Sequence, residues 1–222
     1  LRPDVLFVGF DVDALCTLRA AEAAAAEGVD NAVFLMDGVP SFEEHPEQAH
    51  ASRASVRKGA RSGAPAEVDL SNVFAVGELS ALLMNFPTPF PKKKKAHLRL
   101  TYLDRLMGYR SLLGRGAGIR LRTDSQPLRD FTLTQLELAG YEVTWRSEDV
   151  RAEFPDEPWS AYERKLTEQG ACAFGIAACP GPAPEHVEQT APLSLVSYLP
   201  GNLDQLEYCL LYTSPSPRDG AT

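Results

Sequence analysis

The sequence predicts an α/β fold, with a mostly parallel sheet and helices on both of its faces. Its 222 residues are enough for one well-buried domain. Strand-like and helix-like stretches alternate along the chain, which is typical of parallel sheets. Hydrophobic residues make up 44% and charged residues 23%, as in ordinary soluble proteins. No apolar run approaches the roughly 20 residues of a membrane helix. We therefore expect a cytoplasmic protein without a membrane-spanning segment.

The first predicted unit is a strand, a helix and a second strand. Residues 5–10 (VLFVGF) form a continuous apolar run, the pattern of a strand buried on both faces. Residues 14–27 are rich in alanine and favour a helix that stops at Gly28, a natural helix end. Residues 32–36 form the next short strand. This order predicts a βαβ crossover and hence two parallel strands.

Residues 41–72 interrupt the alternation. They are rich in Ser, Ala, Gly, Pro and charged residues, and they show no period of 2 or 3.6. We predict a long mobile insertion. A role of its basic residues in binding nucleic acid stays open, but a solvated loop fits the composition better.

Regular patterns resume after the insertion. The glycines at 114, 116 and 118 are expected to end the first helix of this part. The predicted elements are a strand at 79–86, a helix at 97–113, a strand at 119–122, a helix at 127–139 and strands at 141–145 and 171–177. We therefore expect one domain over residues 1–178 and an extension over 179–208. The final residues, 209–222, resemble a translated sequencing adapter and are expected to be a non-native tail.

The basic residues are concentrated in one segment. Residues 91–125 hold ten Lys and Arg against two Asp, whereas the whole chain has a net charge of −8. The rest of the chain is therefore strongly acidic. This arrangement suits a polyanion that docks at one place on the protein. The four cysteines form no CxxC pair and the histidines do not cluster near them, so no metal site is expected.

Ligands of open α/β sheets bind at the carboxyl ends of the strands. That rule selects Asp11, Asp37, the loop 85–95 and Asp124, because each follows a predicted strand directly. A carboxylate such as that of Asp11 can accept charge-assisted hydrogen bonds from the two hydroxyls of a ribose. The alternative for Asp11 is a loop-capping aspartate.

The loop 85–95 (NFPTPFPKKKK) is the most specific of these segments. Three prolines stiffen the backbone just past a buried strand, which suits a loop that must hold a planar base. Phe90 can stack on a base, and the lysines that follow can meet phosphates. The alternative is a proline-rich turn followed by a solvated lysine run.

This loop resembles the FPDPWPKK signature of the bacterial-type tRNA (guanine-N7)-methyltransferases. Four further stretches are similar to motifs of that family and occur in the family's order. They are FVGFDV (7–12), NAVFLMDG (31–38), IRLRTDSQPLRDF (119–131) and SAYERKLTEQG (160–170).

The resemblance implies a Rossmann-like, class I S-adenosylmethionine-dependent methyltransferase. Its reaction would be methyl transfer from S-adenosyl-L-methionine to N7 of guanosine 46 in the variable loop of tRNA. The family pattern places Asp11, Asp37, Asn85 and Thr88 at the cofactor, with Thr88 at the catalytic position. It places Lys92, Asp124, Ser160, Ala161, Tyr162 and Glu163 at the tRNA substrate.

Two departures from the family pattern matter. The family's first strand and Gly-rich loop would precede Leu1, so we expect the chain to lack them and to bind cofactor poorly on its own. In addition, Thr88 stands where the family has an aspartate. A catalytically weak or silent tRNA-binding member of the same fold is therefore an alternative, as is a methyltransferase acting on another substrate. The oligomeric state is left open by the sequence.

Overall fold

The computed structural model describes residues 2–36, 39–41 and 67–201. Contacts within the chain divide it into two compact units, Leu1–Ala75 and Val76–Thr222. We describe the two units separately. In the described residues, no helix combines the length and the apolar character needed to cross a membrane.

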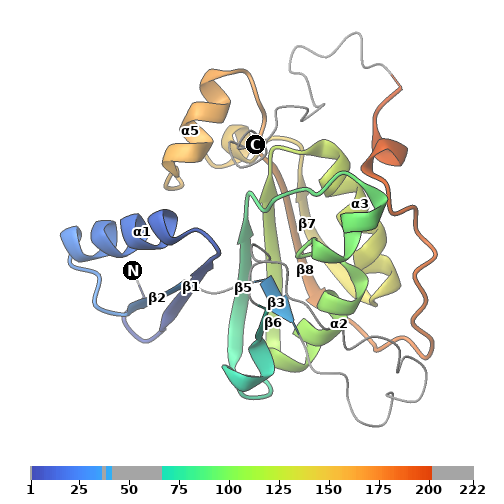
Figure 1. Ribbon diagram of the computed structural model, residues 1–222, viewed down its shortest axis with the longest axis horizontal. Helices are drawn as coiled ribbons and strands as arrows, with labels where there is room; N and C mark the ends of the chain where they lie inside the picture. Colours follow the sequence, from blue (N-terminus) through green and yellow to red (C-terminus); the bar gives the residue numbers. More distant parts are fainter. Residues whose placement is uncertain (1, 37–38, 42–66, 202–222) are drawn as a thin grey trace, which may run out of the picture. The chain divides into compact units, whose positions relative to one another are not determined.

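The first unit contains the predicted βαβ crossover (Figure 1). Strands β1 (Phe7–Asp11) and β2 (Ala32–Met36) pair in parallel, and α1 (Ala14–Ala26) connects them. The helix begins at Asp13, whose carboxylate accepts hydrogen bonds from the backbone N–H groups of Leu15 and Cys16. It ends before Gly28, whose φ of 68° is left-handed. All three predicted elements are confirmed.

The burial of β1 differs from the expectation. Val8 and Phe10 are half-buried, and Phe7 is 40% exposed. Within the described part of this unit, α1 is the helix that packs on the two strands, so it can cover only one of their faces. The Phe10 ring also contacts the Phe74 ring edge-on, with centroids 6.2 Å apart.

The predicted insertion contains regular secondary structure at both of its ends. Strands β3 (Val39–Ser41) and β4 (Glu67–Asp69) pair in parallel, and the 3₁₀ turn η1 (Leu70–Asn72) follows. The prediction of an unstructured stretch is therefore wrong at residue 41 and at 67–72. Pairing between strands that are distant in sequence supplies hydrogen bonds that composition does not reveal. The rest of the insertion, 42–66, lies outside the described residues.

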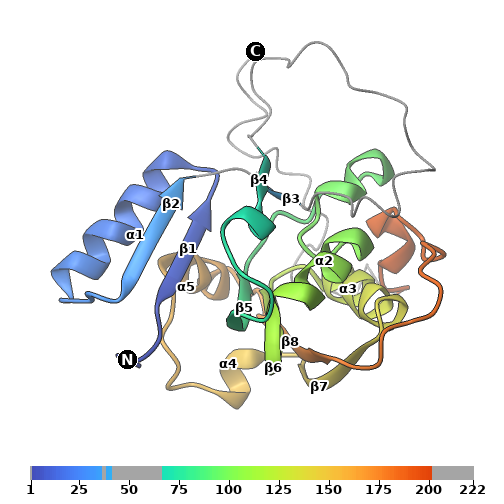
Figure 2. The same cartoon turned by 90° about the horizontal axis from the view of Figure 1, so that it is seen from below.

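The second unit is built on a four-stranded mixed sheet in the order β5-β6-β8-β7. Strand β5 (Leu79–Asn85) runs parallel to β6 (Leu113–Thr123). Strand β8 (Phe174–Pro180) is antiparallel to both of its neighbours, β6 and β7 (Tyr141–Ser147). Helices α2 (Leu103–Leu112) and α3 (Gln126–Leu138) pack on one face of this sheet (Figures 1 and 2).

The helix expected at 97–113 is displaced. Residues Lys93–Leu98 form the 3₁₀ turn η2, and the α-helix begins only at Leu103. Arg99 and Tyr102 are extended, with ψ of 136° and 147°, so the chain changes direction between the two turns. The guanidinium of Arg99 is buried against backbone carbonyls.

The glycines at 114, 116 and 118 lie in β6 and do not end a helix. At Gly114 the two parallel strands approach so closely that a Cβ would lie 2.7 Å from the carbonyl oxygen of Gly77. At Gly118 a Cβ would lie 2.6 Å from the carbonyl oxygen of Ala178 on β8. The glycines thus permit close backbone approach on both sides of the strand, which explains why β6 starts six residues earlier than predicted.

The opposite face of the sheet is contacted by the segment that contains α4 (Val150–Glu153) and α5 (Ala161–Glu168). Alternate residues of a strand point to opposite faces, and Ile119 and Leu121 are buried. Between them, Arg120 points the other way and lies 5.0 Å above the Trp145 ring and 6.0 Å from the Phe154 ring. The whole is a Rossmann-like α/β fold.

The end of the described chain packs on α3. The 3₁₀ turn η3 (Leu195–Tyr198) places Leu195 in a buried cluster with Leu128 and Phe131. The Tyr198 ring meets the Phe131 ring edge-on at 5.9 Å. Part of the predicted extension 179–208 therefore contributes to the core of the second unit, although it shows no clear sequence pattern.

Candidate active site

The proline-rich loop leaves β5 in a strained conformation. It begins at Phe86, whose N–H donates to the carbonyl oxygen of Arg122 at 2.8 Å and so continues the β5–β6 pairing by one residue. Phe86 and Phe90 have φ values of 48° and 44°. Each precedes a proline, and left-handed backbone at a bulky residue costs on the order of 1–3 kcal/mol. Such strain persists only where surrounding contacts maintain it, and it is concentrated at functional sites.

Contacts with the protein core hold this loop in place. The Arg99 guanidinium donates from Nε to the Pro89 carbonyl at 3.0 Å and from Nη2 to the Phe90 carbonyl at 2.7 Å. It also stacks 4.3 Å above the Phe131 ring. The backbone N–H of Leu195 donates to the Pro91 carbonyl at 3.1 Å. Burial lowers the pKa of Arg99 to about 10, so its guanidinium stays charged at neutral pH.

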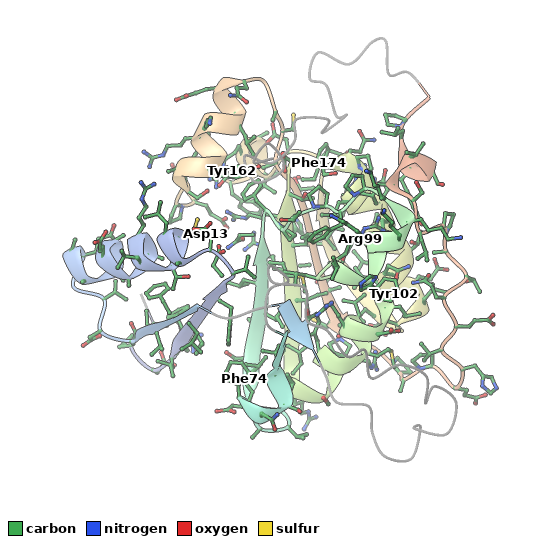
Figure 3. All side chains as sticks on the ribbon, viewed as in Figure 1. Asp13, Phe74, Arg99, Tyr102, Tyr162 and Phe174 are labelled. Atoms are coloured by element: carbon green, nitrogen blue, oxygen red, sulfur yellow. The ribbon has the colours of Figure 1, made fainter. Side chains whose placement is uncertain are left out.

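A ring contact joins this loop to the second predicted substrate segment. The rings of Phe86 and Tyr162 meet edge-on with their centroids 5.4 Å apart. Tyr162 lies in the first turn of α5, which begins at Ser160 because the Ser160 hydroxyl accepts from the Glu163 N–H at 3.0 Å. Two segments more than 70 residues apart in sequence are thus brought together. Tyr162 is visible on α5 in Figure 3.

A buried ion pair fixes α5 in this position. Glu163 is 2% exposed and receives two hydrogen bonds from Arg151, at 2.5 Å and 2.7 Å. Arg151 also donates to the carbonyls of Glu157 and Pro158 and lies 4.4 Å above the Trp159 ring. Both carboxylate oxygens of Glu163 are therefore occupied inside the protein. Its substrate role stays a prediction.

The acid after β6 is also buried. Asp124 is 9% exposed and precedes Ser125, whose hydroxyl caps α3 by accepting from the Leu128 N–H. Burial raises the pKa of the Asp124 carboxyl, and a backbone hydrogen bond opposes the shift in part. A carboxyl group that lies at a strand's carboxyl end with a raised pKa is typical of functional sites. Asn85 and Thr88, by contrast, are exposed.

The basic segment divides into exposed and occupied groups. Lys92–Lys95 are all exposed on η2, where they are accessible to a polyanion. Arg122 is half-buried and forms an ion pair with Glu157, which also pairs with Arg120. Burial lowers the pKa of Arg122. Arg99 is buried beneath the loop, so it is not accessible to a phosphate.

The predicted cofactor acids belong to the first unit. Asp11 ends β1 and is exposed, and its Oδ1 accepts from the Asp13 N–H at 2.8 Å. A carboxylate has about four acceptor positions, so it retains capacity for ribose hydroxyls, and its chemistry fits that part of the cofactor. Asp37 lies outside the described residues. The cofactor roles of Asp11 and Asp37 stay a prediction.

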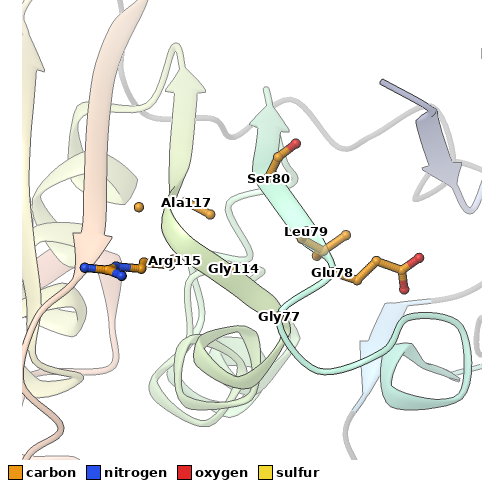
Figure 4. Close-up of a pocket in the computed structure, with 8 residues that line it drawn as sticks. Gly77, Glu78, Leu79, Ser80, Gly114, Arg115 and Ala117 are labelled. Atoms are coloured by element: carbon orange, nitrogen blue, oxygen red, sulfur yellow. The ribbon is translucent and has the colours of Figure 1, made fainter. Parts of the chain in front are cut away.

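A shallow hollow of about 440 Å³ lies at the opposite ends of the strands (Figure 4). It is lined by residues 77–80 before and within β5 and by 114–117 in β6. It is remote from the carboxyl ends of β5 and β6, where the strained loop and the buried acid lie, so we do not assign the site to it.

Residues 64–175 match a family model described as "Putative methyltransferase". The match extends over half of the chain and includes the loop, Asp124 and α5. The chain belongs to this methyltransferase family. Membership identifies a methyltransferase-type enzyme with an S-adenosylmethionine-type methyl donor. Among solved structures, the crystal structure of the [4+2]-cyclase SpnF is similar, with 13% sequence identity over 80% of this chain and 67% of that chain and a TM-score of 0.43.

The roles of two arginines at this candidate site, Arg99 and Arg151, were not predicted from the sequence. Each acts through backbone carbonyls or a carboxylate brought close by the fold. Neither lies in a motif that marks such a role. The proline-rich loop was the available signal, because a stiff loop requires partners for its carbonyls.

Proposed function

We propose that this methyltransferase transfers a methyl group from S-adenosyl-L-methionine to N7 of guanosine 46 in the variable loop of tRNA. The observation that carries the proposal is the contact between Phe86 and Tyr162, because it joins the proline-rich loop to the start of α5. The family resemblance places Asn85 and Thr88 of this loop at the cofactor, and Lys92 and Ser160–Glu163 at the tRNA substrate.

The chemistry suits a site whose main task is alignment. Guanine N7 has an in-plane lone pair and no proton, so attack on a methyl group requires no strong general base. When bound, S-adenosyl-L-methionine supplies that methyl group on a sulfonium. Holding two reactants in line contributes roughly 7–11 kcal/mol to catalysis. Backbone hydrogen bonds fix the loop at Phe86 and Pro91, and the buried Arg99 guanidinium binds two of its carbonyls. The loop is therefore suited to hold a flat purine in one orientation.

Charge stabilisation is the second requirement. Positive charge moves onto the imidazole ring of guanine as the methyl group is transferred, and a nearby carboxylate would stabilise it. Thr88 is neutral and offers only a hydroxyl. Asp124 directly follows β6, the strand that pairs with β5. It therefore places a carboxyl group at the carboxyl ends of these two strands. We assign Thr88 to positioning of the base and Asp124 to the substrate.

The exposed lysines would bind the RNA. Lys92–Lys95 follow the loop directly and form an exposed cationic turn. Phosphate contacts of this kind orient a nucleic acid without selecting its sequence. Selection of the guanosine would then fall to the loop and to Tyr162, whose 43% exposed ring can stack on a base.

The test is methylation mapped at single-nucleotide resolution. Protein expressed from the full gene is incubated with labelled S-adenosyl-L-methionine and a tRNA transcript, and 7-methylguanosine is located by chemical cleavage. A transcript with adenosine at position 46 is the matched control. We expect label at G46 and none in the control. Methylation at another position would indicate a different substrate, and binding without methylation would indicate the silent tRNA-binding alternative, for which Thr88 is the supporting feature.

A further inference from the structure

Arg99 is among the most deeply buried side chains of the second unit. It is 1% exposed, and it lies with Tyr102 on the helical side of the sheet (Figure 3). Its Nε and Nη2 donate to two successive carbonyls of the loop, those of Pro89 and Phe90. Of these two residues, Phe90 has left-handed backbone, with a φ of 44°. A single guanidinium therefore connects the strained loop to the core.

We infer that Arg99 is a positioning residue that holds the Phe86–Phe90 backbone in the conformation that presents Thr88 to the substrate. The role of Thr88 in this inference rests on the proposed function. The effect of Arg99 on the backbone of the loop rests on its hydrogen bonds and its ring contact alone. Arg99 itself does not touch the substrate, because it is buried beneath the loop.

The geometry requires an arginine and not any cation. The planar fork of the guanidinium spans two adjacent carbonyls while its flat face rests on the Phe131 ring, 4.3 Å away. A lysine ammonium is a compact point charge that cannot bridge the carbonyls and stack on the ring together. Charge-assisted hydrogen bonds are stronger than neutral ones, so they can maintain a backbone that otherwise relaxes.

The contribution of Arg99 to stability does not by itself explain its burial. Among the described residues, Arg99 Nη1 is buried without a hydrogen-bond partner. A buried charge with an unfilled donor stabilises a fold less than a well-packed apolar side chain would. The arrangement makes sense if the shape of the loop, rather than stability, is what the guanidinium maintains.

The test compares Arg99→Lys with Arg110→Lys. Arg110 is a matched control, since its guanidinium also donates to two successive carbonyls, those of Ala139 and Gly140, and lies 5.3 Å above the ring of Tyr141. It donates to the Gly181 carbonyl as well. These partners are at the start of β7 and the end of β8, away from the loop. Both substitutions keep the charge and remove the fork.

Hydrogen exchange provides a readout independent of methylation. The N–H of Phe86 donates to Arg122 and the N–H of Leu195 donates to Pro91, so these two amides report on both ends of the loop. We expect Arg99→Lys to accelerate exchange at both amides and to leave β6 and α3 unchanged. Arg110→Lys should leave both amides unchanged. Unaltered exchange at Phe86 and Leu195 in Arg99→Lys would overturn the inference.

Single-turnover kinetics distinguish a positioning role of Arg99 from a general loss of structure. In single turnovers we expect Arg99→Lys to slow methyl transfer by roughly tenfold to a hundredfold, the usual effect of a small misplacement. The Kd for tRNA should change by less than about twofold, because the exposed lysines supply the phosphate contacts. Equal methylation rates in Arg99→Lys and wild type would refute the positioning role. If wild type methylates no tRNA, the proposed function fails while the exchange experiment still tests the loop.

A second variant covers the case that Arg99→Lys does not fold. Phe131→Leu removes the ring under the guanidinium but keeps the apolar core and the hydrogen-bonding groups of Arg99. We expect the same two amides to exchange faster, by a smaller factor. Exchange that stays at the wild-type rate in this variant would also contradict the inference.

Discussion

Replacing Glu163 tests whether the first turn of α5, the second predicted substrate segment, depends on a buried ion pair. Glu163→Ala removes the carboxylate that binds Arg151 through two hydrogen bonds, at 2.5 Å and 2.7 Å. Both side chains are below 10% exposed, so the guanidinium would be left buried with two carbonyls as its remaining partners.

The size of the effect follows from that burial. Breaking a buried pair by removing one partner costs about 3–5 kcal/mol. In a protein of this size each kcal/mol lowers Tm by about 2–4 °C, so Tm should fall by roughly 6–20 °C. Replacing both partners with apolar residues, Arg151→Met with Glu163→Leu, should cost clearly less than the single change, because no charge is then left unpaired.

Thermal and urea unfolding measure this difference. The matched control is Arg146→Ala, which removes an ion pair with Glu148 whose partners are 50% and 62% exposed. Exposed pairs contribute about 0–1 kcal/mol, so this variant should be close to wild type. A loss below about 1 kcal/mol for Glu163→Ala, or a double variant less stable than the single one, would refute the reasoning.

Three further predictions concern the site. Changing Lys92–Lys95 to Gln should weaken tRNA binding and reduce the slope of log K against log salt by roughly 3 to 4, and an unchanged slope would exclude this turn from the interface. Thr88→Asp should raise the single-turnover methylation rate roughly tenfold or more, because a carboxylate stabilises the developing positive charge, and an equal or lower rate would contradict this. Burial raises the pKa of Asp124, so the folded protein binds a proton there more tightly than the unfolded chain does. The stability of the folded state at this residue therefore decreases as pH rises through the acidic range and the carboxyl group ionises. Asp124→Asn should therefore be more stable than wild type at pH 7, less so at pH 3, and slower in methylation; a variant destabilised at pH 7 would count against it.

Local patterns predicted most of the secondary structure. The βαβ unit was predicted from a continuous apolar run and from an alanine-rich stretch that stops at Gly28, and the helix α3 was predicted close to its observed bounds. β5 was likewise placed by its apolar run. These features depend on neighbouring residues, so they are visible in the sequence alone.

The errors arose where distant segments determine the structure. Gly114–Gly118 look like a helix end but permit close approach of β5, β6 and β8. Arg99 looks like a surface cation, but the fold places Phe131 and two loop carbonyls around it. The turn η3 shows no periodicity and is ordered by packing on α3. Tertiary contacts outweigh local preference in each case.

Several of the predicted site residues lie in two segments that the structure brings together. The loop and Ser160–Glu163 were selected from motifs, and the Phe86–Tyr162 contact brings them together. Ser160 and Glu163, however, have structural tasks that the motif does not show, a helix cap and a buried ion pair. Their spacing in sequence could not reveal a partner such as Arg151.

The central claim is that the loop after β5 and the first turn of α5 hold the guanine of tRNA. Photocrosslinking tests it most directly, with 6-thioguanosine placed at position 46 of the tRNA and crosslinked peptides identified by mass spectrometry. The account predicts crosslinks to residues 86–92 and to Tyr162. Crosslinks confined to other parts of the chain, such as the hollow at 77–80 and 114–117, would contradict it.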